Sequence, residues 1–369
     1  MSQEIQAFNS KVEHCLCAPG DGVFTVNTAK ERKAALRNKL YGQTENVDTL
    51  WRESLNELPH SPHKAVMLGI SSDCGGGILR GANWGPLFVR SALIDQHPEC
   101  HSFDLGDVRV IPHLLHDKYL NDTTISNCQK ALYGNENNDY YVSPLSITED
   151  VCDSFYATFK DKGIFGIGGD HSISYPLTKA YLKAKREQGK RTAIIHFDAH
   201  TDLLVERLGI DLCFGSWCTH ILEFLPAPHH LIQFGIRSSG KPKSHWENTF
   251  GVKQHWAHEI IERGAAAVAA ETIAQLKADN VDEVYVSFDI DALDAEFASA
   301  TGTPEDNGLT PKHALDILSA IGDEFPITGA DMMEIAPFTD SSLVGQASSE
   351  TTLKEGAKIS AFLINAMNK

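Results

Sequence analysis

Short apolar runs, each followed by a glycine-rich or polar segment, recur from residue 64 toward the end of the chain. They are rich in Ile, Val and Phe, and their length is typical of strands that are buried on both faces of a parallel sheet. The pattern predicts six strands: 64–70, 162–170, 191–198, 230–238, 281–291 and 325–335.

Amphipathic stretches lie between these runs and predict helices at 175–189, 269–280 and 310–322. In the last of them, Thr310 is placed to cap the helix and Pro311 occupies its first position. Strands that alternate with helices indicate an α/β fold, a three-layer α/β/α arrangement with a mainly parallel central sheet.

Residues 1–63 differ from the rest because they are polar and lack a clear period. We expect an N-terminal extension with some helix, for example over 28–40. No Pro-, Ser- or Gly-rich linker divides the remainder. Residues 64–369 are therefore expected to form a single catalytic domain.

The formal net charge of −17 disfavours nucleic acid and anionic membranes as partners and suits a cationic substrate. The longest apolar run is far below the ~20 residues of a membrane helix, and the N-terminus lacks a signal-peptide core, so a cytoplasmic location is expected. The eight Cys are expected to be free thiols, since Cys15 and Cys17 form C-x-C and no second pair completes a zinc site.

Potential metal ligands follow several of the predicted strands. His171 comes after 162–170, Asp198, His200 and Asp202 form D-x-H-x-D after 191–197, and Asp289 and Asp291 form D-x-D at the end of 281–291. Because alternate residues of an extended chain face the same side, each set points one way. The carboxyl ends of parallel strands share one edge of a sheet, so the sets should converge there.

Carboxylates that converge without Lys or Arg repel one another unless cations are bound. Carboxylate and imidazole ligands without thiolate favour Mn²⁺, Ni²⁺ or Fe²⁺ over a structural zinc. Six ligands are too many for one open catalytic ion, so two divalent ions that share bridging carboxylates fit better.

These residues also carry a family likeness. The segments "GGDHS", "HFDAHTD", "SFDIDALDAEFASATGTPEDNGLT" and "MEIAP" resemble the ureohydrolase superfamily of arginases, agmatinases and formimidoylglutamases, and the likeness covers roughly residues 64–369. "HFDAHTD" and "TGTPE" look more like agmatinases than arginases. The resemblance implies an arginase-like fold, a binuclear Mn²⁺ or Ni²⁺ site, and a homotrimer or homohexamer.

Carried over residue by residue, the resemblance assigns roles to the ligands. It implies that one ion is held by His171, Asp198, Asp202 and Asp289, and the other by Asp198, His200, Asp289 and Asp291. Glu334 would pair with the guanidinium of a substrate, and Asp202 would relay a proton to the leaving nitrogen. The implied reaction is hydrolysis of a guanidino C–N bond with release of urea.

One loop departs from the family pattern. It reads "CFGSWC" (213–218), with Phe214 where many members carry a histidine. Phe214 and Trp217 could line the substrate pocket, since an aromatic face can hold a planar cation. They could equally pack as ordinary loop hydrophobes, and His220 could replace the missing histidine. The departure favours guanidine or a short guanidino compound over agmatine or arginine.

Three other functions compete with this one. A formimidoylglutamase-type enzyme shares the ligands and would cleave a formimino group. A non-catalytic subunit of a ureohydrolase complex would keep the fold, although such subunits usually lose ligands and all six are present here. A metal-dependent amide deacetylase of similar topology is disfavoured by the spaced ligands together with Glu334.

Overall fold

The computed structural model describes residues 3–23, 29–77, 79–136, 138–339 and 349–369. Its centre is a nine-stranded sheet in the order β1-β3-β2-β4-β9-β8-β5-β6-β7. Every neighbouring pair is parallel except β1 and β3. The strands are β1 (Leu16–Cys17), β2 (Ala65–Gly69), β3 (Phe103–Val108), β4 (Gly163–Ile167), β5 (Thr192–Phe197), β6 (Leu231–Ile236), β7 (Lys253–Trp256), β8 (Glu283–Asp289) and β9 (Ile327–Met333).

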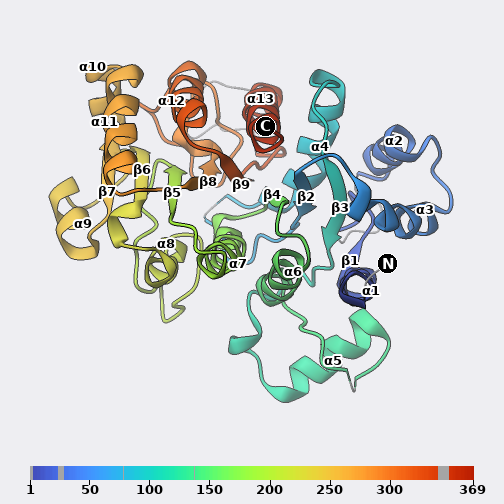
Figure 1. The fold of residues 1–369 in the computed structure, drawn as a ribbon. Helices are drawn as coiled ribbons and strands as arrows, with labels where there is room; N and C mark the ends of the chain where they lie inside the picture. The colour runs from blue at the N-terminus through green and yellow to red at the C-terminus, as the bar shows by residue number, and fades with distance from the viewer. Residues whose placement is uncertain (1–2, 24–28, 78, 137, 340–348) are drawn as a thin grey trace.

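Helices cover both faces of this sheet (Figure 1). One layer holds α4 and α10 to α13, and the other holds α6 to α8. The helices are α1 (Gln3–Cys15), α2 (Lys30–Tyr41), α3 (Val47–Ser54), α4 (Gly85–Gln96), α5 (Asp122–Tyr133), α6 (Pro144–Thr158), α7 (Ser174–Glu187), α8 (Trp217–Ile221), α9 (Lys243–Phe250), α10 (Ala257–Arg263), α11 (Ala265–Ala278), α12 (Pro311–Glu324) and α13 (Ser349–Met367). The predicted three-layer α/β/α fold is confirmed.

The six predicted strands are all present, as β2, β4, β5, β6, β8 and β9, and the three predicted helices are α7, α11 and α12. Thr310 caps α12 as expected, because its side chain accepts a hydrogen bond from the backbone N–H of His313 at 3.1 Å. The strands β1, β3 and β7 were not predicted. They lie toward the two edges of the sheet, where the demand for apolar residues is lower.

The N-terminal residues pack against the edge of the sheet that carries β1 and β3. Phe8 and Val12 of α1 and Trp51 of α3 are at most 1% exposed and belong to the same apolar cluster as Val66 of β2. The segment before residue 64 therefore contributes side chains to the main core. In Figure 1, α1, α2 and α3 gather at the side of the molecule opposite β7.

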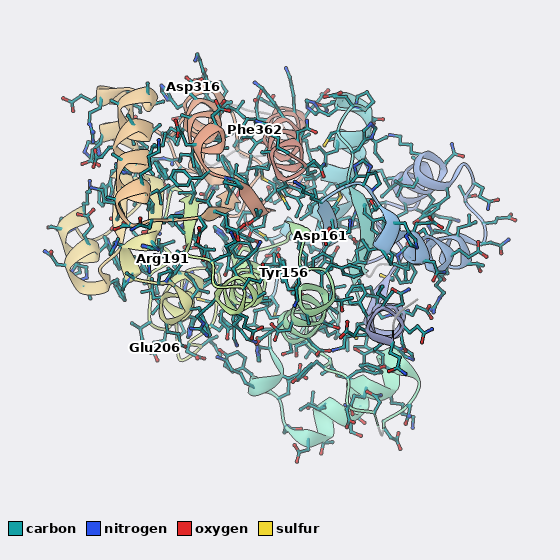
Figure 2. The ribbon with its side chains drawn as sticks, in the orientation of Figure 1. Tyr156, Asp161, Arg191, Glu206, Asp316 and Phe362 are labelled. Atoms are coloured by element: carbon teal, nitrogen blue, oxygen red, sulfur yellow. The ribbon has the colours of Figure 1, made fainter. Side chains whose placement is uncertain are left out.

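All eight cysteines are free thiols, as predicted. No helix among the described residues is long and apolar enough to cross a membrane. Figure 2 draws the side chains on this fold, whose interior is mainly apolar, so the polar groups that are buried there need a specific explanation.

Candidate metal centre

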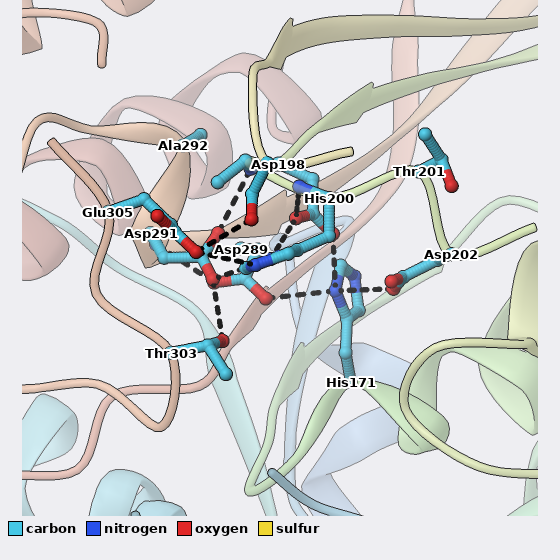
Figure 3. A network of polar contacts seen from close by, with 12 residues as sticks. His171, Asp198, His200, Thr201, Asp202, Asp289, Asp291, Ala292, Thr303 and Glu305 are labelled. Carbon is cyan, nitrogen blue, oxygen red and sulfur yellow. Dashed lines mark hydrogen bonds and ion pairs between the residues drawn. The ribbon is translucent and has the colours of Figure 1, made fainter. Parts of the chain in front are cut away.

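Six acidic and histidine side chains meet at the carboxyl ends of β4, β5 and β8 (Figure 3). Five of them are at most 4% exposed, and the sixth, His200, has a side chain that is 23% exposed. They are the six ligands that the sequence predicts: His171, Asp198, His200, Asp202, Asp289 and Asp291.

His171 forms the centre of one half of the cluster. Its Nδ1 lies 3.1 Å from Asp198 Oδ2, 3.3 Å from Asp202 Oδ2 and 3.0 Å from Asp289 Oδ2. One nitrogen cannot form hydrogen bonds to three carboxylates at once, and Nδ1 has no well-aligned partner. Three carboxylates and one imidazole around a common point are a suitable donor set for a divalent ion.

His200 forms the centre of the other half. Its Nδ1 lies 3.3 Å from Asp198 Oδ1 and 3.1 Å from Asp291 Oδ2. Asp198 therefore turns one oxygen to His171 and the other to His200. A carboxylate shared in this way can bridge two ions, which is the role the resemblance implies for it.

The charges of the cluster favour cations. Burial and the neighbouring charge of Asp198 raise the pKa of Asp202 well above its usual value, and burial and Asp291 do the same to the pKa of Asp289. Among the residues that the structure describes, these carboxylates form ion pairs with histidines and with no Lys or Arg. Bound divalent ions would reverse both pKa shifts, so the residues present fit a metal pair.

A row of buried hydrogen bonds orients His171. Its Nε2 lies 3.0 Å from the hydroxyl of Ser287, which donates to Asp331 Oδ1 at 2.8 Å. Ser174 and Tyr285 also donate to Asp331, at 3.0 and 2.8 Å. Because Nε2 is held in this way, Nδ1 is directed at the three carboxylates, as is typical of metal-binding histidines.

Asp202 is held by Trp217. The indole Nε1–H donates to Asp202 Oδ2 at 2.8 Å, and the ring lies 5.0 Å from the ring of His171. Asp202 itself has a φ of 51°, in the left-handed region that few residues other than glycine adopt. Backbone strain of this kind at a carboxylate that also has a shifted pKa is a frequent property of functional sites.

Glu334 lies directly after β9 and is also in the left-handed region, with a φ of 63°. Its side chain is 2% exposed, and its Oε1 accepts a hydrogen bond from the backbone N–H of His171 at 2.9 Å. Burial, followed by the charges of Asp289 and Asp170, raises the pKa of Glu334 well above its usual value. A Cβ on Gly302 would lie 3.0 Å from Glu334 Oε2, so glycine leaves room beside this carboxyl group.

A model of the arginase family matches residues 63–361, a range that includes all six residues of this cluster and Glu334. The chain belongs to the arginase family. The predicted superfamily is thereby confirmed, and so is the predicted enzyme class, a hydrolase that acts on amidine or guanidino C–N bonds.

Individual members of the arginase family support this result. An agmatinase of Bacillus subtilis (strain 168) is 34% identical over 198 residues, which span 52% of this chain and 63% of that protein. An agmatinase of Bacillus anthracis is 33% identical over 292 residues, 76% of this chain and 86% of that protein. The solved structure of proclavaminate amidinohydrolase from Streptomyces clavuligerus has a TM-score of 0.61 and 25% identity, and covers 83% of this chain and 92% of that one.

In this arginase-family protein, Phe214 and Trp217 occupy different places. Phe214 is half-buried and lines a groove of about 480 Å³, while Trp217 is fully buried beneath Asp202 and does not line that groove. His220 lies away from the cluster, with its Nε2 2.8 Å from the carbonyl of Asp211. Glu206, the acid nearest to the loop in sequence, is exposed at the surface (Figure 2).

The sequence prediction did not include His196, which is fully buried beside the cluster. Gln233 donates to its Nδ1 at 2.9 Å, so its Nε2 carries the proton and donates to Asp198 Oδ2 at 3.0 Å. His196 therefore orients a ligand and is not itself a ligand through Nε2. The sequence could have indicated His196, because it precedes Asp198 by two residues and so faces the same side of an extended chain.

Proposed function

We propose that the protein is a binuclear-metal hydrolase that cleaves a guanidino C–N bond and releases urea from a small guanidino compound. The observation that carries this proposal is the position of Asp198 between His171 and His200, with Glu334 bonded to the backbone of His171. This arrangement supports the proposal of a pair of ion sites beside a buried carboxylate that suits a planar cation.

The ligands proposed for the two ions are His171, Asp198, Asp202 and Asp289 for one, and Asp198, His200, Asp289 and Asp291 for the other. Two Mn²⁺ or Ni²⁺ ions at these positions would supply a hydroxide nucleophile near neutral pH and neutralise the carboxylates.

The chain itself orients the substrate and moves the proton. Glu334 pairs with the guanidinium and turns its carbon toward the cluster, which excludes bulk water because its carboxylates are buried. Asp202 accepts a proton at its carboxylate and passes it to the departing nitrogen. Trp217 holds the Asp202 carboxylate in position through the indole N–H.

The groove beside the cluster supports a short substrate. Gly77, which lines the groove, lies close to Thr303, because a Cβ added to Gly77 would be 3.1 Å from the Thr303 side chain. The Thr303 hydroxyl donates to Asp291, so the groove adjoins the cluster. Arg80 and Arg207 line the groove, and the Arg207 guanidinium lies 5.1 Å from the ring centroid of Phe214. The described residues that line it include no Asp or Glu.

Asp73 offsets the charge of Arg80, since their side chains lie 3.7 Å apart, whereas Arg207 keeps the groove positive, which repels the second positive charge of agmatine and accepts a neutral or carboxylate tail. We therefore propose guanidine or a short guanidino acid as the substrate. The test is urea release from guanidine, guanidino acids, arginine and agmatine, with Mn²⁺ and Ni²⁺ supplied separately and formamide measured beside urea. Faster hydrolysis of agmatine or arginine than of every shorter compound contradicts this substrate, and formamide from a formimino compound contradicts the reaction.

Phe214→Ala extends the test to the pocket. If Phe214 limits the length of the substrate, the variant should hydrolyse longer guanidino compounds faster relative to guanidine, since a removed ring leaves space for a tail. Phe250→Ala, a change to a partly buried phenylalanine of α9, is the matched control and should leave the ratio unchanged.

Three further parts of the proposal concern the whole chain. We propose that the catalytic domain begins near residue 64, with the preceding segment packed on it through β1 and α1, that the protein is located in the cytoplasm, and that it assembles as a homotrimer or homohexamer. Light scattering of the purified protein tests the assembly, cell fractionation tests the location, and a chain that begins at residue 64 tests the boundary through its urea release.

A further inference from the structure

A second group of potential metal ligands lies at the opposite end of the strands. His229 and His230 immediately precede β6, and Asp279 follows the last residue of α11. One ligand atom from each of the three lies within 4.8 Å of the others. Thr192, which contacts this group, begins β5, and Asp198 follows the end of β5, so at ~3.3 Å per residue the two groups are roughly 20 Å apart.

The ring of His230 is oriented like that of a metal ligand. His230 is 1% exposed, and its Nδ1 lies 3.0 Å from the carbonyl oxygen of Thr192. A carbonyl can only accept, so Nδ1 carries the proton and Nε2 presents a lone pair. That Nε2 has no hydrogen-bond partner among the described residues and lies 3.9 Å from Asp279 Oδ2.

The other two side chains are held around the same point. His229 Nε2 lies 3.2 Å from Asp279 Oδ2, which is buried and lacks a well-aligned hydrogen bond within the part of the chain that the structure describes. The Gln275 side chain donates to the carbonyl of His229 at 3.1 Å, and Arg191 (labelled in Figure 2) donates to the carbonyl of Asp279 at 3.0 Å. These bonds fix the backbone of both ligands.

We propose that His229, His230 and Asp279 bind one divalent transition ion of the Zn²⁺ or Ni²⁺ type. Two imidazoles and one carboxylate without thiolate suit such ions. At bond lengths of ~2.0–2.2 Å, ligand atoms around a tetrahedral ion lie ~3.3–3.6 Å apart, so the separations present here need only small side-chain movements. The side chain of His229 is 45% exposed, which leaves an entry path and a fourth position for water.

A simple ion pair does not explain this group. Protonated His229 could pair with Asp279, but that pair leaves the buried lone pair of His230 without a partner. An ion satisfies all three side chains at once. It also connects the start of β6 to the end of α11, so the ion stabilises this edge of the fold without taking part in the reaction at the other end of the strands.

The test is the number of Zn²⁺ ions bound per chain. Wild-type protein, His229→Ala and Asp279→Asn are equilibrated with excess Zn²⁺, separated from free ion by gel filtration and analysed by elemental analysis. Each variant should bind one ion fewer than the wild type. Both changes are at partly exposed side chains, which avoids the risk that a change at buried His230 prevents folding.

His258→Ala, a change to an exposed histidine of α10 outside the group, is the control and should bind as many ions as the wild type. Added Zn²⁺ should also raise the Tm of the wild type more than that of His229→Ala, whereas urea release by both variants should match the wild type once the catalytic ions are supplied. Equal ion counts in the wild type and in both variants would overturn the proposal. That result would leave the proposed hydrolase function untouched, because the two readouts are separate.

Discussion

The contact between Trp217 and Asp202 gives the sharpest test of how the metal centre is positioned. Trp217→Phe keeps an aromatic ring in the core but removes the Nε1–H that donates to Asp202 Oδ2 at 2.8 Å. A hydrogen bond to a charged group contributes about 1.5–3 kcal/mol. If that energy holds Asp202 in its reactive position, kcat should fall roughly 10- to 150-fold.

The assay is steady-state urea release at saturating metal, with the ion content of each sample determined in parallel. Because Trp217 is fully buried and lies outside the groove, KM should change little. Trp51→Phe is the matched control, since Trp51 is 1% exposed and its Nε1 donates to the carbonyl of Leu105 at 3.1 Å, far from the cluster in the fold. It should lower the Tm as Trp217→Phe does and leave kcat unchanged.

Two results would refute this reasoning. If Trp217→Phe keeps the wild-type kcat with a full complement of ions, the indole N–H does not position Asp202. If the variant instead raises activity on long guanidino compounds, Trp217 acts on the size of the pocket, which is the role that the sequence suggests and that its buried position argues against.

The remaining predictions concern the ligands, Glu334 and a buried histidine. Asp198→Ala should remove both ions because Asp198 contacts both histidines of the cluster, and elemental analysis that finds one ion retained would contradict a bridging role. Glu334→Gln should keep both ions but lose about 2–5 kcal/mol of transition-state stabilisation, so that kcat/KM falls by several decades. Wild-type turnover in this variant would show that Glu334 is structural. Burial lowers the pKa of His255 to about 4, so the unfolded chain binds its proton first as the pH falls. Between pH 6.5 and 4 the free energy of unfolding of the wild type should therefore fall by roughly 3 kcal/mol more than that of His255→Phe. Urea unfolding at several pH values measures this difference, and an equal fall in both proteins would contradict the assignment.

The catalytic half of the fold could be predicted because its information is local. β5 and β8 are fully buried and mainly apolar, and the ligands come where these strands end: Asp198 and His200 follow β5, Asp289 is the last residue of β8, and Asp291 lies in the short 3-10 helix after it. Since parallel strands bring their carboxyl ends to one edge, the meeting of these ligands follows from pattern alone.

β3 shows where the local pattern fails. Its Asp104 and Asp107 interrupt the apolar run, and they are tolerated because Arg90 of α4 pairs with both, at 2.8 Å for Asp104. Burial of a carboxylate is favourable only when such a partner is present. The partner lies 14 residues from Asp104, so the strand could not be recognised from its own residues.

The sequence by itself determined which residues could bind metal, which segments are buried strands and which family the chain resembles, because each depends on neighbours in the chain. Only the tertiary structure decided that Trp217 lies under Asp202 while Phe214 lines a groove, although only two residues lie between Phe214 and Trp217 in the chain. It likewise brought Asp279 to His229 and His230 from about fifty residues away. Contacts of this kind depend on the path of the chain between the partners, and hydrophobic periodicity carries no information about that path.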